Sequence, residues 1–337
     1  MAPEANHDPV SVIIAAFFLY RYMAVAQGHD PEAITEWSKA VSNYVKEKRL
    51  DDLCAGRNPT ATLALSRREE ASPAMTHEKK THMARLMLWT FYEDIFASIK
   101  GYGGALARHF VEKPERSREI YQYSCAELES VWGADYPERE ILDDVENAPI
   151  ISFLYEVITL YAEVNRAVSS PLDLPAAKSA VEEKIDKLEA RSRSLIRLTT
   201  MNVQPRSRVM INADYMVPLF YALRIYCFRS FLSDDSLATP SPPAVQSSVS
   251  SILQLAQRSL SRGPLDPMQA RFQWPLFMAG IETTDRIHKE WAHSKLRTAS
   301  MSIAFQTIVC LEEETQRRTP MPLVRQLMDT KNSAIPM

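Results

Sequence analysis

Three groups of carboxylates are the residues whose types could support metal-dependent chemistry. They are the run Asp143-Asp144-Val145-Glu146-Asn147 and the pairs Asp51-Asp52 and Asp234-Asp235. Helical enzymes that act on isoprenoid substrates hold Mg²⁺ and diphosphate between facing carboxylates on helices. The run lacks a second carboxylate at the expected turn spacing, and it lies between Pro137 and Pro149, where we expect a loop or a short helix. We therefore interpret all three groups as solvated acidic turns and caps, and keep an α-helical enzyme acting on isoprenoid or other apolar substrates as an alternative.

A second candidate for metal binding is the triplet Glu282, Asp285 and His288, whose spacing of three places them on roughly one face of a helix. A di-iron site needs a second, matching Glu-x-x-His helix, which the sequence does not contain. We interpret the triplet as a solvated polar face and predict no metal site. His109 and His293 have no obvious partner in the sequence.

Nucleophilic and phosphate-binding motifs are missing from the sequence. There is no Gly-x-Ser-x-Gly elbow, and the Gly101-Tyr102-Gly103-Gly104 turn is not followed by the Lys and Ser or Thr of a phosphate loop. The four cysteines stand far apart, so we expect reduced core thiols and neither a zinc site nor a disulfide framework. They are Cys54, Cys125, Cys227 and Cys310. We predict no catalytic residue and no cofactor.

Aromatic residues at helical spacing are the remaining candidates for a binding site. Such stripes, here around Trp89 and Tyr221, belong to a core more often than to a cofactor site, but they can also line a pocket for an apolar ligand between helices. The residues that we expect to line such a pocket are Trp89, Tyr92, Tyr221, Arg224 and Trp274.

The elements that would position these residues are helices. Apolar residues recur at helical spacing from end to end, and strand-like alternation is almost absent, so we predict an all-α fold, a single multi-helix domain over residues 1–337. We expect helices over 31–46, 75–100, 114–133, 150–168, 181–195, 209–231, 245–260, 272–296 and 298–317. Pro218 should kink or restart its helix. Residues 233–243 are rich in Pro and Ser, which predicts an exposed loop and a hinge.

Charge and hydropathy exclude several classes of protein. The net charge is −3, whereas contact with DNA phosphates needs clustered Lys and Arg, so we expect no direct DNA binding. The apolar stretch 10–25 is shorter than the roughly 20 residues of a membrane span and is interrupted by Arg21, so we expect a buried helix. The first residues do not form a secretory signal, which indicates an intracellular protein.

One segment resembles a known family. Residues 273–282, Gln-Trp-Pro-Leu-Phe-Met-Ala-Gly-Ile-Glu, resemble the most recognisable stretch of the fungal-specific transcription factor domain, the regulatory region of many zinc-cluster activators. Arg286, Trp291 and Leu296 are similar to conserved positions of the family's next helix. Upstream, 88–94 and 222–226 with Arg229 resemble two further segments, and in order the resemblance covers about residues 80–330.

The resemblance implies an all-helical regulatory domain that acts in the nucleus on RNA polymerase II genes. In some relatives it also implies a buried cavity that senses a small molecule. Our own hypothesis is a regulatory module that associates with a second copy or with another transcription factor and responds to an apolar small molecule. Relatives carry six clustered cysteines that bind two zinc ions, whereas this sequence has four dispersed ones, so we expect no DNA binding through that module. A helical interaction scaffold without a ligand is a further alternative.

Overall fold

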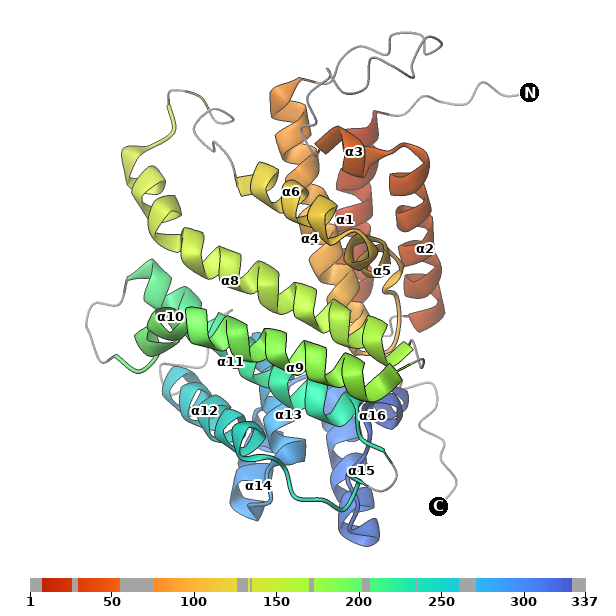
Figure 1. Ribbon diagram of the computed structural model, residues 1–337, viewed down its shortest axis with the longest axis vertical. Coiled ribbons are helices and arrows are strands. Elements are labelled where there is room, and N and C mark those ends of the chain that lie inside the picture. The colour runs from red at the N-terminus through yellow and green to blue at the C-terminus, as the bar shows by residue number, and fades with distance from the viewer. Residues whose placement is uncertain are drawn as a thin grey trace. The chain divides into compact units, whose positions relative to one another are not determined.

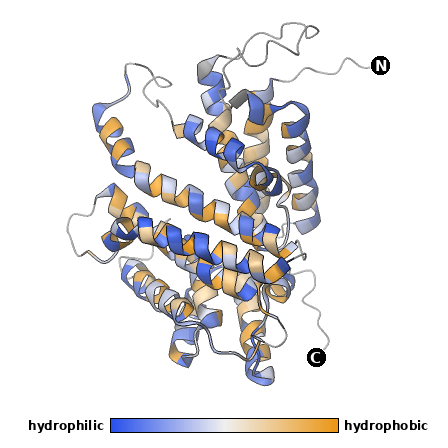
Figure 2. Ribbon diagram, viewed as in Figure 1, coloured by the Kyte–Doolittle hydropathy of each residue, from blue (hydrophilic) through white to orange (hydrophobic). Residues whose placement is uncertain are grey.

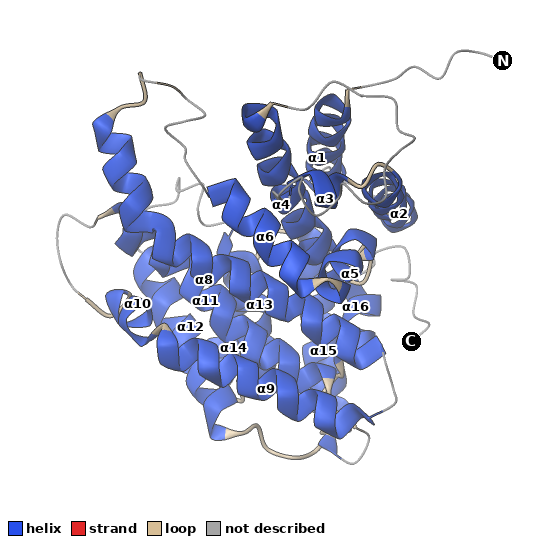
Figure 3. Cartoon of the chain, turned by 45° about the horizontal axis from the view of Figure 1, so that its top comes forward, coloured by secondary structure: helices blue, strands red, loops and turns tan. Residues whose placement is uncertain are grey.

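The computed structural model describes residues 8–25, 30–54, 76–125, 133, 135–169, 173–201, 207–233, 236–260 and 271–328. Within these ranges every regular element is a helix and there is no strand, which confirms the prediction of an all-α fold (Figure 3). Among the described helices, none combines the length and the apolar character that crossing a bilayer requires.

The chain divides into two compact units, residues 1–141 and 142–337. They are described separately below, and the single domain expected over residues 1–337 stays a prediction.

Unit 1 is built around α4, which packs along α1 and α6 (Figure 1). Asp30 caps the start of α2 by accepting a hydrogen bond from the amide of Glu32 (3.1 Å), and Thr76 caps the start of α4 by accepting one from the amide of Lys79 (3.3 Å). The helices of unit 1 are α1 (Pro9–Val25), α2 (Pro31–Glu47), α3 (Leu50–Cys54), α4 (His77–Ile99), α5 (Ala105–Glu112) and α6 (Pro114–Cys125). The predicted helices 31–46 and 75–100 are confirmed, whereas residues 126–132 of the helix predicted over 114–133 lie outside the described residues.

Unit 2 is built around α11 and α13, which pack against each other and against α12. Every residue of α13 from Trp274 to Glu282 is buried. The surface helix α9 buries one apolar face and alternates between hydrophilic and hydrophobic turns along its length (Figure 2). The helices of this part are α8 (Glu138–Ser169), α9 (Leu174–Arg191), α10 (Arg193–Leu198), α11 (Arg208–Ser230), α12 (Pro243–Leu260), α13 (Gln273–Glu282), α14 (Arg286–Lys295), α15 (Ala299–Thr315) and α16 (Met321–Met328).

Two prolines, Pro149 and Pro218, lie inside helices. The run 143–147 belongs to α8, which continues through Pro149, so the loop or short helix predicted there is wrong. In the same way α11 continues through Pro218 without restarting. A proline removes one backbone hydrogen bond from a helix. In α11 buried apolar residues on both sides of Pro218, among them Val217 and Leu219, compensate for that loss. In α8 the buried apolar residues begin after Pro149, at Ile150.

The single helix predicted over 272–296 is wrong, because the segment forms two helices. Asp285 accepts hydrogen bonds from the amides of Ile287 (2.7 Å) and His288 (3.3 Å) and so caps the start of α14. An Asp in this position satisfies amides that a continuous helix would pair with the preceding turn. The break lets α13 lie in the core while α14 lies at the surface.

Candidate functional site

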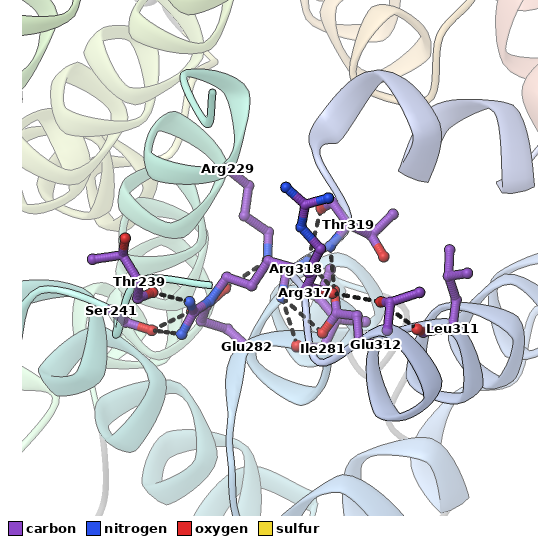
Figure 4. Close-up of polar contacts among 11 residues, drawn as sticks. Arg229, Thr239, Ser241, Ile281, Glu282, Leu311, Glu312, Arg317, Arg318 and Thr319 are labelled. Carbon is purple, nitrogen blue, oxygen red and sulfur yellow. Dashed lines mark hydrogen bonds and ion pairs between the residues drawn. The ribbon is translucent and has the colours of Figure 1, made fainter. Parts of the chain in front are cut away.

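A buried network of charges lies at the centre of unit 2 (Figure 4). Arg229 of α11 is fully buried, and its Nε donates to Glu282 of α13 over 2.5 Å. Its Nη1 donates to Glu312 of α15 (2.8 Å) and to the carbonyl of Thr319 (3.0 Å), and its Nη2 donates to the carbonyl of Ile281 (2.7 Å). One guanidinium therefore joins three helices and the connection before α16.

A second arginine completes the network. The Nε of Arg318 donates to Glu282 over 2.9 Å, and its Nη2 donates to the hydroxyl of Ser241 over 2.8 Å. Its Nη1 donates to the carbonyl of Thr239, and the hydroxyl of Ser241 donates to Glu282. Two arginines and two glutamates thus balance in charge, which is the condition under which ionised groups are tolerated in a protein interior.

The carboxyl group of Glu282 is kept ionised by this arrangement. Burial by itself would raise its pKa, but the charge of Arg229, the hydrogen bond from Ser241 and the charge of Arg318 outweigh burial, so that the pKa lies below its ordinary value. For Arg229 burial lowers the pKa, and Glu282 and Glu312 raise it well above the ordinary value. The two arginines and the two glutamates pair with one another, so the network is a structural junction between helices.

The solvated polar face predicted for Glu282, Asp285 and His288 is therefore wrong at Glu282. Its carboxylate faces the interior and binds two arginines, while Asp285 caps α14 and lies 3.6 Å from Nδ1 of His288. Sequence analysis also missed the partner, because Arg229 precedes Glu282 by 53 positions. The signal that existed is the position of Glu282 at the end of a run of apolar residues, which favours burial.

The acidic groups of the sequence do not form a metal site among the described residues. Asp143 pairs with Arg208 over 2.8 Å, and residues 234–235 lie outside the described ranges. Asp51 is not a solvated turn as predicted, because it is buried and accepts a hydrogen bond from Lys113 (3.1 Å) and lies 3.3 Å from Nε2 of His109. That contact supplies the partner that the sequence did not reveal for His109.

The five predicted pocket residues lie in both units. In unit 1, Tyr92 of α4 is buried and its ring meets that of Trp89 edge to face at 5.6 Å, while Trp89 itself is 48% exposed. In unit 2, Tyr221 is half-buried, Arg224 pairs with Asp186 and Glu189, and the indole of Trp274 donates to the hydroxyl of Tyr161 over 3.1 Å. Trp274 is buried within α13, which begins at Gln273. None of the five lines any of the four hollows described for the two units, and their role in ligand binding stays a prediction.

An apolar face of α1 is exposed, so the prediction that residues 10–25 form a buried helix is wrong. One side of α1 is buried in unit 1 through Ile13, Ala16 and Tyr20. The other side presents a stripe with helical spacing, which we call the α1 stripe: Ser11, Ile14, Ala15, Phe18, Leu19 and Tyr22. Phe18 and Tyr22 are 63% and 70% exposed. A helix that is apolar all round is normally buried all round, so this face needs an explanation.

A hollow adjoins the α1 stripe. It has a volume of about 440 Å³ and lies between α1 and α2, and its lining is almost wholly apolar. The side chains around it include Val12, Ala15, Trp37, Val41 and Tyr44. Small-molecule sites are concave, mostly apolar and of this size. Among the described residues of unit 1, the hollow and the stripe are surface features that suit binding.

Asp94 holds the framework beneath these features. Its carboxylate is fully buried and accepts hydrogen bonds from the hydroxyls of Tyr20 (2.5 Å) and Ser38 (2.6 Å). It also accepts from the amides of Gly104 and Ala107 at the start of α5, each over 2.8 Å. Carboxylates at a helix N-terminus are stabilised by such amides. Asp94 thus fixes α1, α2 and α5 on α4; in the sequence it is the last residue of the segment 88–94 that resembles the family, and its structural role was not predicted.

The burial of the cysteines and the contact made by His293 differ in part from the predictions. Cys227 is buried, and burial raises the pKa of its thiol to about 12. Cys125 and Cys310 are exposed, so the prediction that all four are core thiols is wrong for these two. Nε2 of His293 lies 2.8 Å from the hydroxyl of Ser302 on α15.

Comparison with known proteins gives one match. The family model of the fungal specific transcription factor domain matches residues 61–309. This range includes the whole of α4 and all of α13 and α14, with both ends of the Arg229–Glu282 ion pair. Neither a curated protein nor a solved structure matches the chain.

Proposed function

The chain belongs to the fungal-specific transcription factor domain family, and we propose that it regulates RNA polymerase II transcription in the nucleus through protein–protein association. The role of the family is transcription regulation, and it is not an enzymatic one. The observation that supports association is the α1 stripe, because contiguous exposed apolar surface rimmed by polar residues marks sites of protein contact.

The pattern of the α1 stripe favours a second copy of the chain as the partner. In an antiparallel pair of α1 helices related by a twofold axis, residue i faces residue 33 − i if the axis passes between Ala16 and Phe17. Small side chains then meet large ones, because Ser11 faces Tyr22 and Ala15 faces Phe18, while Ile14 faces Leu19. Alternation of small and large residues is what lets two helices pack closely. No charged residue belongs to the stripe itself.

Trp89 of α4 is a further exposed aromatic residue of unit 1. It is one helical turn before Glu93 in α4, and the carboxylate of Glu93 meets the guanidinium of Arg21 in α1 at 3.8 Å. Exposed aromatic residues near the centre of an interface contribute most of its binding energy. We therefore include Trp89 in the association surface.

The experiment is light scattering coupled to size-exclusion chromatography, on the wild-type chain and on the Phe18→Glu/Tyr22→Glu variant. We expect a dimer for the wild type and a monomer for the variant, with unchanged circular dichroism. The matched control is Val145→Glu, an apolar residue of similar exposure (68%) in unit 2, which should leave the dimer intact. A wild-type monomer at all concentrations would refute self-association. A reporter gene under the control of the chain should follow the oligomeric state.

The hollow between α1 and α2 supports a second candidate function, the sensing of an apolar small molecule. Its volume and lining suit an apolar ligand of drug-like size, and Trp37 provides an intrinsic fluorescent probe. Native mass spectrometry of the chain purified from its own host should show a retained molecule that Ala40→Trp, which fills the hollow, excludes. An empty chain, with no quenching of Trp37 by apolar metabolites from that host, would count against sensing and would leave the dimer proposal untouched.

A further inference from the structure

The connection between α11 and α12 carries two hydroxyl residues that are each followed directly by proline. The sequence there is Ala238-Thr239-Pro240-Ser241-Pro242. A proline holds the residue before it in an extended backbone, which is the conformation in which protein kinases bind the residue that they phosphorylate. One class of kinase requires proline directly after that residue. By sequence alone Thr239 and Ser241 are equal candidates.

The structure separates the two. Ser241 is only 8% exposed, and its hydroxyl donates to the buried carboxylate of Glu282 and accepts from Arg318. The side chain of Thr239 is exposed. Its amide donates to the carbonyl of Ser236 over 3.1 Å, which fixes the backbone of the loop and not the side chain. Thr239 therefore presents its hydroxyl to solvent, whereas Ser241 would first have to leave the buried network.

The guanidinium of Arg318 lies beside Thr239. Arg318 uses its backbone amide to bind the carbonyl of Leu237 (2.9 Å) and its Nη1 to bind the carbonyl of Thr239. A guanidinium has five N–H donors, and contacts with Thr239, Ser241 and Glu282 occupy three of them. The side chain of Arg318 is 15% exposed, and its guanidinium carbon lies 5.7 Å from the centroid of the Phe228 ring. Arg317 is exposed next to it.

We propose that Thr239 is a phosphorylation site for a proline-directed kinase, and that Arg318 receives the phosphate. The γ-phosphoryl group of ATP passes to the hydroxyl oxygen of Thr239: a phosphorus–oxygen bond to Thr239 forms, the bond to ADP breaks, and the hydroxyl proton is released. The product carries about 1.5 to 2 negative charges and three acceptor oxygens beside a guanidinium, an arrangement that orders loops.

The consequence reaches the core of unit 2. Because Arg318 also binds Glu282, and Glu282 binds Arg229, the phosphate adds an ion pair to a junction that already joins α11, α13 and α15. Phosphorylation should therefore tighten the loop and stabilise unit 2. This site is independent of the α1 stripe, which lies in the other unit, so the two proposals fail separately.

The first test is phosphorylation of the full chain by a proline-directed kinase with ATP, followed by peptide mapping. We expect phosphate on Thr239 in the wild type and in the matched control Ser241→Ala, and none at that position in Thr239→Ala or Pro240→Ala. Phosphate on Ser241 with Thr239 unmodified, or no phosphate on either, would overturn the proposal.

The second test asks whether Arg318 receives the phosphate. The second pKa of a phosphate is about 6, and a neighbouring guanidinium lowers it, so the phosphorus resonance of the folded chain should titrate at lower pH than that of a phosphorylated peptide of residues 236–243. The phosphorylated chain should also melt at a higher temperature than the unmodified one. Arg318→Gln should remove both effects, whereas Arg258→Gln, which changes an arginine that pairs with Asp214 elsewhere in unit 2, should preserve them. Identical titration of chain and peptide would refute the role of Arg318 without requiring any variant to fold.

Discussion

Replacing Arg229 by Met should destabilise unit 2 severely, because it removes one side of a buried ion pair. Arg229 has no exposed surface and donates five hydrogen bonds. One goes to Glu282, two go to Glu312, and two go to the backbone carbonyls of Ile281 and Thr319. Met fills a similar volume but leaves the carboxylates of Glu282 and Glu312 facing each other across the junction. Breaking a buried pair in this way costs about 3–5 kcal/mol of the free energy of unfolding.

The same helix contains the matched control. Arg224 also pairs with two carboxylates, but those of Asp186 and Glu189 are 65% and 46% exposed. Exposed pairs contribute about 0–1 kcal/mol, so Arg224→Met should cost about 1 kcal/mol or less. Both variants are compared with the wild type by urea denaturation followed by circular dichroism, and hydrogen exchange of the α13 amides localises the loss. If Arg229→Met unfolds at the same urea concentration as Arg224→Met, the buried network does not hold unit 2 together.

Three further predictions concern other buried contacts. The pKa of Glu282 lies below its ordinary value, so the stability that its carboxylate contributes is present above about pH 4.5 and is lost as the pH falls through its folded pKa. In urea denaturation at a series of pH values, Glu282→Gln should be less stable than the wild type at neutral pH and should lose less stability on acidification. Parallel pH profiles of the two proteins would contradict this. A methyl group at Gly280 would lie 2.5 Å from the ring of Phe305, so Gly280→Ala should lower the free energy of unfolding by about 1–3 kcal/mol, as followed by thermal melting. Adding Phe305→Leu should restore part of this stability. A melting temperature equal to that of the wild type would show that α13 and α15 can move apart to admit the methyl group. The two carboxylate oxygens of Asp94 accept four hydrogen bonds, and Asp94→Asn replaces one of these oxygens by an amide group that donates. The substitution should lower the stability of unit 1 by about 2–3 kcal/mol in urea denaturation. An unchanged midpoint would show that these hydrogen bonds do not stabilise unit 1.

Much of the local structure could be predicted because its causes are local. Helical spacing of apolar residues gave the all-α class, and Asp30 with Pro31 marked the start of α2. The segment 273–282 pointed to the family that the matching model then established. The local prediction failed at Pro149, where α8 continues through the proline into the buried segment that begins at Ile150.

The sequence by itself determined the all-α class, the start of α2 at Asp30 and Pro31, and the family, since backbone hydrogen bonds and caps join residues at most a few positions apart. Only the tertiary structure decided which face of α1 is exposed, that Glu282 faces inward, and that Ser241 is buried while Thr239 is not. Arg229 and Glu282 are 53 positions apart, and Arg318 lies 36 positions beyond Glu282. Ion pairs between residues so far apart in the sequence depend on how the helices pack against one another. The spacing of residues within one helix does not determine which distant charge will pair with a residue of that helix.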